Sequence, residues 1–521
     1  MAVERGEGTR GLELYRQATR LDPHLAGAWM GLGVQLKGKR EMEEGFRCFA
    51  RAVAEADRTL RQFPGDRPSH VARAMACTLL FLPGEAAESY RRALEIAPDI
   101  ILHGELLFLM NSLPETTPEA LYAESCRWNS QYAASVAQPV RTFANVPDPG
   151  RRLRIGYVSA DLYEHPIMKL LPPVLEACDR SQFAVTLYAV GKKADARTAE
   201  LPKLVESFVP RLESGRALDE RIRADGIDIL VDLAGHTMPI EYFWVFARKA
   251  APIQVSWLGL LSTTGLQTMD YYLGDGELPC AGTEGCFSET VYRLPRSTNC
   301  YRPAAIPPLA PSPCLERGYV TFGSFNSPNK LGREVVRVWA AVLRAVPRSR
   351  ILMKYWGMDT EILRDRYLGW FSKEGIARER VDFEGASPAR EFLETYARID
   401  IALDPFPYQG GSTTQDTLLM GVPVVALAGR LAVQRSSASI LKASGLGGMV
   451  VESAERYVKV AATLAGIVGQ TPALRQEIRK AFLSSPYMDE AGFTRDLEAA
   501  YRDMWRTWCG KQAAGGAPIT G

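Results

Sequence analysis

A doubled glycine followed by hydroxyl residues marks the stretch ALDPFPYQGGSTTQDTLLMGVPVVAL at 402–427. The apolar residues before DPFPY predict a strand, and those after GGSTT predict a helix. The start of such a helix presents unpaired N–H groups and the positive end of its dipole, and glycines let a ligand approach the backbone. The pattern predicts a diphosphate site, with an acidic residue one turn into the helix for a ribose hydroxyl. Its residues are Gly411, Ser412, Thr413, Thr414 and Asp416. The simpler alternative is an N-capped, solvated turn.

A second polar loop lies in TFGSFNSPNKLGREVVRVW at 321–339, between a predicted strand and a predicted helix. Lys330 in this loop offers a cation that can neutralise a leaving phosphate, and Asn326 and Ser327 offer hydrogen-bond donors beside it. Taken alone, a lysine in a loop is usually a solvated charge. Together with the glycine-rich loop, it indicates chemistry at a phosphate ester.

Two of the five histidines follow predicted strands of the preceding region: His165 in GYVSADLYEHPIMKLL and His236 in DLAGHT. In open α/β sheets ligands bind at the carboxyl ends of the strands, so we expect both rings to face a cleft, with Asp161 on the loop of His165. The alternative for each is a structural histidine. The stretch WLGLLSTTGLQTMDY at 257–271 adds the backbone amides of Leu258 and Gly259 and the hydroxyl of Thr263, which hold sugar hydroxyls or simply turn the chain.

Two series of short apolar runs, which alternate with helical stretches, must position these loops. The first series predicts strands at 152–160, 183–190, 227–235, 252–259 and 269–275. The second predicts strands at 319–325, 350–355, 380–385, 399–406, 422–429 and 448–453. We therefore expect two α/β lobes, at 150–302 and 318–487, joined by a proline-rich linker at 303–317. A last helix at 488–508 is expected to fold back on the first lobe, and 509–521 to form a flexible tail.

The first 149 residues carry a helical repeat. With Trp29 at position 4 of a 34-residue tetratricopeptide template, Gly33 falls on position 8 and Phe49 on position 24. One period earlier Tyr15 takes position 24, and after a short insertion Tyr90 does the same. Such units stack into a concave surface, which predicts a macromolecular partner; a plain helical bundle is the alternative. We expect residues 1–100 to contact only that partner.

Composition narrows the function classes further. A net charge of +2 gives no reason to expect a nucleic-acid or membrane partner, and no apolar run is long enough to span a bilayer. The N-terminus has no signal-peptide pattern. The nine cysteines are scattered and suggest reduced thiols in the cytoplasm rather than disulfides or a zinc site.

The region 150–508 resembles the catalytic region of the protein O-linked N-acetylglucosamine transferases and of their SPINDLY relatives, which are protein O-fucosyltransferases. Its motifs occur in the same order as in those enzymes. The resemblance rests on LRIGYVSADLYEHP, GIDILVDLAGHT, APIQVSWLG, YVTFGSFNSPNKL, IALDPFPYQGGSTTQD and LEAAYRDMW, and it is closer to the SPINDLY branch in DPFPY-x-GGSTT and GHT. It implies a glycosyltransferase-B fold of two Rossmann-like lobes after an all-α repeat domain. It further implies an inverting, metal-independent transfer of a sugar to Ser or Thr of a protein acceptor.

The same resemblance assigns roles to single residues. Lys330 matches the lysine that stabilises the leaving diphosphate, and His165 matches an active-site histidine near the sugar and acceptor. Ala386 and Ser387 match residues whose backbone reads the nucleobase. The donor is a UDP- or GDP-linked sugar, with no other cofactor, and either His165 or the donor phosphate takes the acceptor proton. The protein acceptor is bound by the repeats and the cleft.

The sequence departs from the N-acetylglucosamine enzymes at three positions. Ala389 and Phe392 replace a lysine and a histidine on the side of the base, and Gly411 replaces a histidine. The choice between GlcNAc from UDP-GlcNAc and fucose from GDP-fucose therefore stays open. Transfer from another nucleotide sugar, transfer to a non-protein acceptor, and a catalytically inactive repeat adaptor are the alternative functions.

Overall fold

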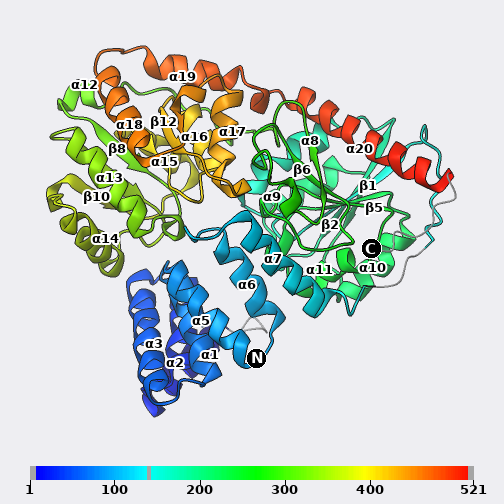
Figure 1. Cartoon of the computed structure of the whole chain (residues 1–521), viewed down its shortest axis with the longest axis horizontal. Coiled ribbons are helices and arrows are strands. Elements are labelled where there is room, and N and C mark those ends of the chain that lie inside the picture. Colours follow the sequence, from blue (N-terminus) through cyan, green and yellow to red (C-terminus); the bar gives the residue numbers. More distant parts are fainter. Residues whose placement is uncertain (1–7, 138–141, 514–521) are drawn as a thin grey trace.

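The computed structural model describes residues 8–137 and 142–513. It consists of a helical domain followed by two lobes, each built on a parallel β-sheet (Figure 1). The two-lobed α/β fold with an N-terminal helical domain, predicted from the sequence, is confirmed. None of the helices in the described ranges is both long and apolar enough to span a membrane.

Antiparallel helix pairs form the N-terminal domain, drawn in blue in Figure 1. Its helices are α1 (Gly8–Leu21), α2 (Ala26–Gly38), α3 (Met42–Gln62), α4 (Arg67–Leu79), α5 (Pro83–Ile96), α6 (Ile100–Met110) and α7 (Pro118–Trp128). A Cβ on Gly33 would lie 2.5 Å from the ring of Phe49, so the small residue of one helix admits the aromatic residue of its partner. This is the close helix approach that the repeat template requires.

The first lobe holds a seven-stranded sheet in the order β3-β2-β1-β4-β5-β6-β7, with every pairing parallel. Its strands are β1 (Leu153–Ser159), β2 (Phe183–Ala189), β3 (Ser207–Val209), β4 (Ile229–Asp232), β5 (Ile253–Ser256), β6 (Tyr271–Gly274) and β7 (Thr290–Arg293). The order reverses at β1, so the loops after β1 and β4 open at the switch point where ligands bind in such sheets.

The second lobe holds a six-stranded parallel sheet in the order β10-β9-β8-β11-β12-β13. Its strands are β8 (Thr321–Ser324), β9 (Arg350–Lys354), β10 (Val381–Glu384), β11 (Ile401–Leu403), β12 (Val424–Leu427) and β13 (Val450–Val451). Here the order reverses at β8, and the neighbouring strands β8 and β11 carry the two polar loops predicted to bind phosphate.

Helices cover both sheets. In the first lobe they are α8 (Leu171–Ala177), α9 (Ala196–Glu200), α10 (Gly215–Ala224) and α11 (Ile240–Ala247). In the second they are α12 (Cys314–Arg317), α13 (Arg333–Ala345), α14 (Glu361–Lys373), α15 (Ala389–Glu394), α16 (Ser412–Leu419), α17 (Ser436–Ala443), α18 (Ala454–Val468) and α19 (Leu474–Leu483). The last helix, α20 (Glu490–Ala513), returns to the first lobe, where Trp505 and Tyr501 are buried against its sheet (Figure 1). It continues past Cys509, where a tail was predicted to begin; residues 514–521 of that tail lie outside the described residues.

The repeat helices pack directly on the two lobes, because their buried faces continue the cores of both lobes. Phe46 of α3 is fully buried and its ring lies 5.5 Å from that of Trp356 in the second lobe. Phe81, between α4 and α5, contacts the same tryptophan. In the first lobe, Trp128 of α7 stacks on Trp244 of α11. The prediction that residues 1–100 contact only a partner is therefore wrong. Burial of these large apolar side chains against the lobes lowers the free energy of the folded state.

Candidate functional site

The glycine-rich loop after β11 is held rigidly against the second sheet. Asp404 follows the strand directly, and its Oδ1 accepts a hydrogen bond from the backbone N–H of Gly410 at 2.9 Å. A Cβ on Gly410 would lie 2.5 Å from Oγ1 of Thr414 and 2.8 Å from Oδ1 of Asp404, so no other residue fits this position unstrained. The hydroxyls of Ser436 and Ser437 donate to the carbonyl of Gly410. The loop therefore delivers α16 in one fixed orientation.

The ammonium group of Lys330 reaches across from the loop after β8. Its Nζ donates to the backbone carbonyl of Gln409 at 2.8 Å and lies 4.1 Å above the ring of Tyr408. The structure thus joins the two loops predicted to bind phosphate. Lys330 is a partly buried, positioned cation and not the solvated charge that a loop lysine usually is.

Burial changes the ionisation of Lys330 and of its acidic neighbour. Desolvation lowers the pKa of Lys330 to about 8, and the charge of Asp404 opposes that shift. Desolvation also raises the pKa of Asp404 to about 7, while the hydroxyl of Ser437, Lys330 and the Gly410 amide oppose that shift. One carboxylate oxygen of Asp404 is buried without a hydrogen-bond partner. Sequence reasoning missed Asp404, although an acidic residue at the carboxyl end of a parallel strand was a usable signal.

The start of α16 presents free backbone donors. In the part of the chain that the structure describes, the N–H groups of Ser412 and Thr413 have no acceptor within the protein, whereas those of Thr414 and Gln415 bond to the carbonyl of Gly411. A Cβ on Gly411 would meet nothing within 4 Å, so this turn borders open space. Unpaired donors and the positive end of the helix dipole make this a place for an anion.

The neighbouring polar residues take part unequally. Oδ1 of Asn326 accepts from the hydroxyl of Thr413 at 3.0 Å, which ties the β8 loop to α16. The hydroxyl of Thr414 is buried and bonds to Ser437 at 2.7 Å, so it supports the loop and does not face a ligand. Ser327 directs its carbonyl to the amide of Lys330 and so shapes the turn.

The loop predicted to read the base follows β10. Ala386 is exposed, and the hydroxyl of Ser387 is shielded from solvent without a hydrogen-bond partner. Phe392, in the helix that follows, lies edge-on to Phe325 and Tyr396 and so joins an aromatic cluster.

Asp416 has hydrogen-bond partners within the protein. Its carboxylate is buried and accepts two hydrogen bonds from Lys169 of the first lobe, at 2.9 and 2.8 Å, and one from the hydroxyl of Tyr301 at 2.5 Å. Lys169 thus contacts both carboxylate oxygens and Tyr301 contacts Oδ1, while the predicted contact of Asp416 with a ribose hydroxyl stays a prediction. From within α16, Asp416 joins the two lobes, a role that its position in the sequence did not reveal.

His165 opens the short 3₁₀ helix η2 (Pro166–Lys169), which ends at the lysine that contacts Asp416. Its Nδ1 accepts a hydrogen bond from the backbone N–H of Ile167 at 3.4 Å. Burial lowers the pKa of His165, with Asp161 acting in the opposite direction, so the ring is neutral near pH 7. With Nδ1 as acceptor, the neutral ring carries its proton on Nε2, which makes that nitrogen a hydrogen-bond donor.

The prediction that His236 faces the cleft is wrong. Its ring lies 4.7 Å from that of Trp128 and 5.2 Å from that of Phe243, and its Nε2 bonds to the carbonyl of Thr264 at 2.8 Å. Burial lowers its pKa to about 4. The ring thus connects α7 to the first lobe as a neutral structural group, which was the alternative interpretation of the sequence.

The loop after β5 is also structural at two of its three predicted positions. The hydroxyl of Thr263 donates to the buried carboxylate of Glu289 at 2.7 Å, so it is not available to a sugar. The amide of Gly259 donates to the carbonyl of Trp257, and a Cβ there would lie 2.6 Å from the backbone of Ala234. Leu258, at φ +63°, makes the turn, and its amide has no acceptor among the described residues.

Metal ligands do not cluster in this site. Within the described ranges, no group of three or more His, Cys, Asp or Glu side chains is arranged to hold a metal ion. Metal independence remains a prediction.

Comparison with known proteins gives the family. The model of glycosyl transferase family 41 matches residues 131–298 and 314–497. A probable UDP-N-acetylglucosamine–peptide N-acetylglucosaminyltransferase SPINDLY from Petunia hybrida is 35% identical over 80% of this chain and 45% of its own length. A probable SEC transferase from Arabidopsis thaliana is 29% identical over 70% of this chain and 38% of its own length. The chain thus spans about half the length of the curated relatives it matches.

A solved structure extends the comparison to nearly the whole chain. A lysine-to-methionine mutant of the O-GlcNAc transferase of Thermobaculum terrenum superposes with a TM-score of 0.88 and 32% identity, and the match covers 98% of this chain and 96% of that one. The higher identity to SPINDLY than to SEC agrees with the motifs DPFPY-x-GGSTT and GHT. From its family match, its relatives and its fold, this chain belongs to glycosyl transferase family 41.

Proposed function

We propose that the protein is an inverting, metal-independent O-glycosyltransferase that moves a sugar from a nucleotide sugar to a Ser or Thr hydroxyl of a protein acceptor. The names of the relatives support the reaction class: the SPINDLY and SEC proteins are named as transferases from UDP-N-acetylglucosamine to peptide, and the Thermobaculum protein as an O-GlcNAc transferase. UDP-GlcNAc and GDP-fucose are the two donors to be compared, because Gly411 and Phe392 change the sugar and base sides of the site.

The free amides at the start of α16 beside Lys330 carry this proposal. A diphosphate bound next to Ser412 and Thr413 accepts from their N–H groups, and the Lys330 ammonium lies on the adjoining loop. These donors are held by the protein before the reaction, so they stabilise the charge that develops on the leaving diphosphate without reorganisation. Each such donor contributes on the order of 10²–10³-fold in rate.

The reaction is a single displacement. The acceptor oxygen forms a bond to the anomeric carbon while the bond from that carbon to the diphosphate oxygen breaks, and attack from the opposite face inverts the configuration. Because Nε2 of His165 is a donor in the neutral ring, we assign His165 to hold a hydroxyl of the sugar or acceptor. The acceptor proton then passes to an oxygen of the leaving diphosphate.

The acceptor enters between the helical domain and the lobes in this proposal, and the reaction takes place in the cytoplasm. All nine cysteines are free thiols, several of them buried, which suits a reducing compartment.

A thermal-shift screen with UDP, GDP and CMP tests the donor, because a ligand that binds only the folded state raises the unfolding midpoint. Transfer of labelled sugar from UDP-GlcNAc and GDP-fucose to synthetic Ser/Thr peptides and to a lysate then tests the acceptor. If neither UDP nor GDP raises the unfolding midpoint, the proposed nucleotide site is contradicted. Transfer only to non-protein material contradicts the acceptor, and binding without turnover indicates an inactive adaptor.

A further inference from the structure

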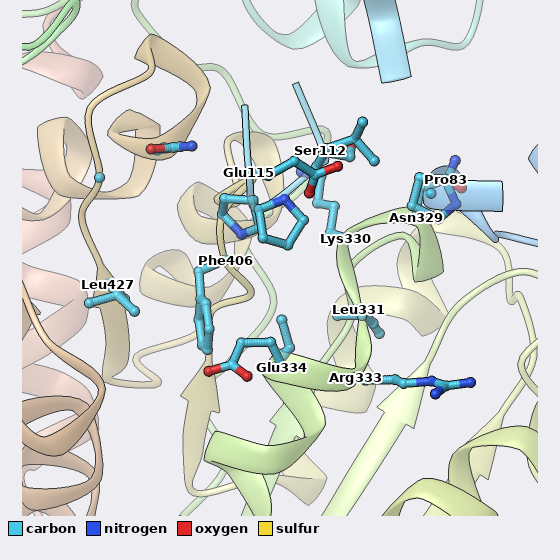
Figure 2. Close-up of a pocket in the computed structure, with 18 of the residues that line it drawn as sticks. Pro83, Ser112, Glu115, Asn329, Lys330, Leu331, Arg333, Glu334, Phe406 and Leu427 are labelled. Carbon is cyan, nitrogen blue, oxygen red and sulfur yellow. The ribbon is translucent and has the colours of Figure 1, made fainter. Parts of the chain in front are cut away.

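A pocket of about 570 Å³ lies between the helical domain and the carboxyl edge of the second sheet (Figure 2). We name it the interface pocket; its walls are residues 81–85, 112–115, 328–335, 406–407, 427–429 and 452–454, with Trp370 and Gln434. The volume falls within the range of about 300–1,000 Å³ that is typical of ligand sites. Pockets at domain interfaces and at the ends of parallel strands are usual places for ligands.

The interface pocket is separate from the nucleotide site but adjoins it. Of the residues predicted to bind the nucleotide sugar or to catalyse transfer, Lys330 alone lines it, and the start of α16 does not. Lys330 therefore forms part of the wall while its ammonium reaches the carbonyl of Gln409. A molecule in the pocket therefore lies next to Lys330, which the proposed function places at the leaving diphosphate, and contacts the repeat helices at the same time.

The walls are apolar and the charges are mainly acidic. The apolar side chains include Phe81, Leu113, Leu331, Trp370 and Phe406. Four acidic residues, Glu85, Glu115, Glu334 and Glu452, and two basic ones, Lys330 and Arg333, line the pocket. Arg333 lies over the ring of Trp370, and Glu334 is paired with Arg337. In the described part of the chain, Glu85, Glu115 and Glu452 form no ion pair, and all three are exposed at the rim. This surplus of negative charge disfavours a phosphate and favours a cation.

Asn329 belongs to the wall of the interface pocket. Figure 2 shows Asn329 beside Pro83, at the boundary between the second lobe and the helical domain. The pocket is therefore lined from both domains at this point.

We propose that the interface pocket binds a segment of the protein acceptor that carries a lysine or arginine within a few residues of the modified hydroxyl. The aliphatic stem of a long basic side chain packs on the apolar walls while its charged end reaches the rim carboxylates. The short range follows from Lys330, which belongs to both sites, because an extended chain advances only about 3.3 Å per residue. This inference deepens the proposed function and rests on it.

Two matched sets of synthetic Ser/Thr peptides provide the test. One set carries Lys and Leu around the hydroxyl residue, and in the other each Lys is replaced by Glu. Binding of fluorescein-labelled peptides to the UDP-saturated or GDP-saturated full chain is measured by anisotropy, and transfer is measured separately with labelled donor. Anisotropy tests the pocket, and transfer tests the proposed function, so the two can fail independently.

The variant Glu85→Gln/Glu115→Gln/Glu452→Gln removes the unpaired rim charges, and Glu334→Gln is the control because its carboxylate is already paired with Arg337. We expect the triple variant to bind the Lys peptides about tenfold more weakly, a loss that shrinks at high salt, and the control to bind them as the wild type does. Glu115→Lys should reverse the preference toward the Glu peptides. Nucleotide stabilisation should be unchanged in all variants.

Equal affinity of the wild type for both peptide sets, or no effect of the triple variant, overturns the inference whether or not sugar is transferred. Absence of transfer from either donor to any peptide, with Lys-selective binding intact, leaves the pocket supported and counts against the proposed function.

Discussion

The ammonium of Lys169 donates to both oxygens of Asp416, at 2.9 and 2.8 Å, and thereby ties the first lobe to the helix whose start binds the donor diphosphate in our proposal. Lys169 ends the short helix that His165 begins. The pair therefore fixes how the His165 loop and the start of α16 face each other. The hydroxyl of Tyr301, next to the interlobe linker, completes the contact.

Removal of one partner of this pair should destabilise the protein. Lys169→Met leaves the buried charge of Asp416 with the Tyr301 hydroxyl alone, and breaking a buried pair in this way costs on the order of 3 kcal/mol. Urea denaturation of Lys169→Met, Asp416→Asn and the double variant measures the interaction as a double-mutant cycle. We expect the double variant to lose less unfolding free energy than the two single variants lose together. Strict additivity contradicts an energetic link between the lobes.

Replacement of Lys330 should abolish most turnover. Lys330→Met removes the cation that the proposal assigns to the leaving diphosphate, and kcat should fall on the order of 10²-fold or more. The lysine is partly buried and bonded to Gln409, so some stability is lost as well, contrary to what an exposed loop lysine predicts. Unfolding must therefore be measured beside the kinetics. Lys203→Met, which changes an exposed surface lysine, is the control; equal kcat in both variants removes the assigned role.

The pH profile should depend on the same lysine. The pKa of Lys330 is lowered to about 8, so the free enzyme loses its ammonium, and kcat/KM falls, as the pH rises through that value. The negative charge of Asp404 raises the pKa of Lys330. Asp404→Asn should therefore shift this alkaline limb to lower pH. A limb that does not move, in a variant that still unfolds cooperatively, shows that Asp404 does not set the ionisation of Lys330.

Activity should survive chelation. In our proposal the amides at the start of α16 and the Lys330 ammonium compensate the diphosphate charge, so we expect the reaction to need no divalent ion. Rates in EDTA and in added Mn²⁺ or Mg²⁺ should agree. Loss of turnover in EDTA that Mn²⁺ restores would mean that the diphosphate is held in another way.

Contacts between the repeats and the second lobe should matter for folding. Phe46→Ala leaves a cavity beside Trp356 and Phe81 and should cost about 3–5 kcal/mol. Leu21→Ala, at a position that is 79% exposed, should change stability by less than about 0.5 kcal/mol. For the same reason, a truncation near Pro98 exposes an apolar face and is expected to abolish cooperative unfolding. A truncated chain that unfolds cooperatively and binds nucleotide as tightly as the full chain contradicts this view of the repeats.

The pattern of apolar, glycine and polar residues along the sequence was enough to predict the two sheets, the glycine-rich loop and the loop that carries Lys330. Buried parallel strands are continuous apolar runs, and the turn into α16 requires Gly410, so both are visible in the sequence. The edge strands β3 and β7 were not predicted, because they are short and only partly buried, so they lack such a run. The helix at 488–508 was predicted from its pattern, and the structure extends it to Ala513.

Tertiary structure alone decided which polar residues are free for a ligand. Thr263, His236 and Asp416 each follow a recognisable motif, yet each is occupied by a partner distant in sequence: Glu289, Trp128 and Lys169, respectively. Hydroxyl, imidazole and carboxylate groups serve equally well as ligand contacts and as internal hydrogen-bond partners. Only the packing of the lobes and helices, which decides what each group is buried against, distinguishes the two uses.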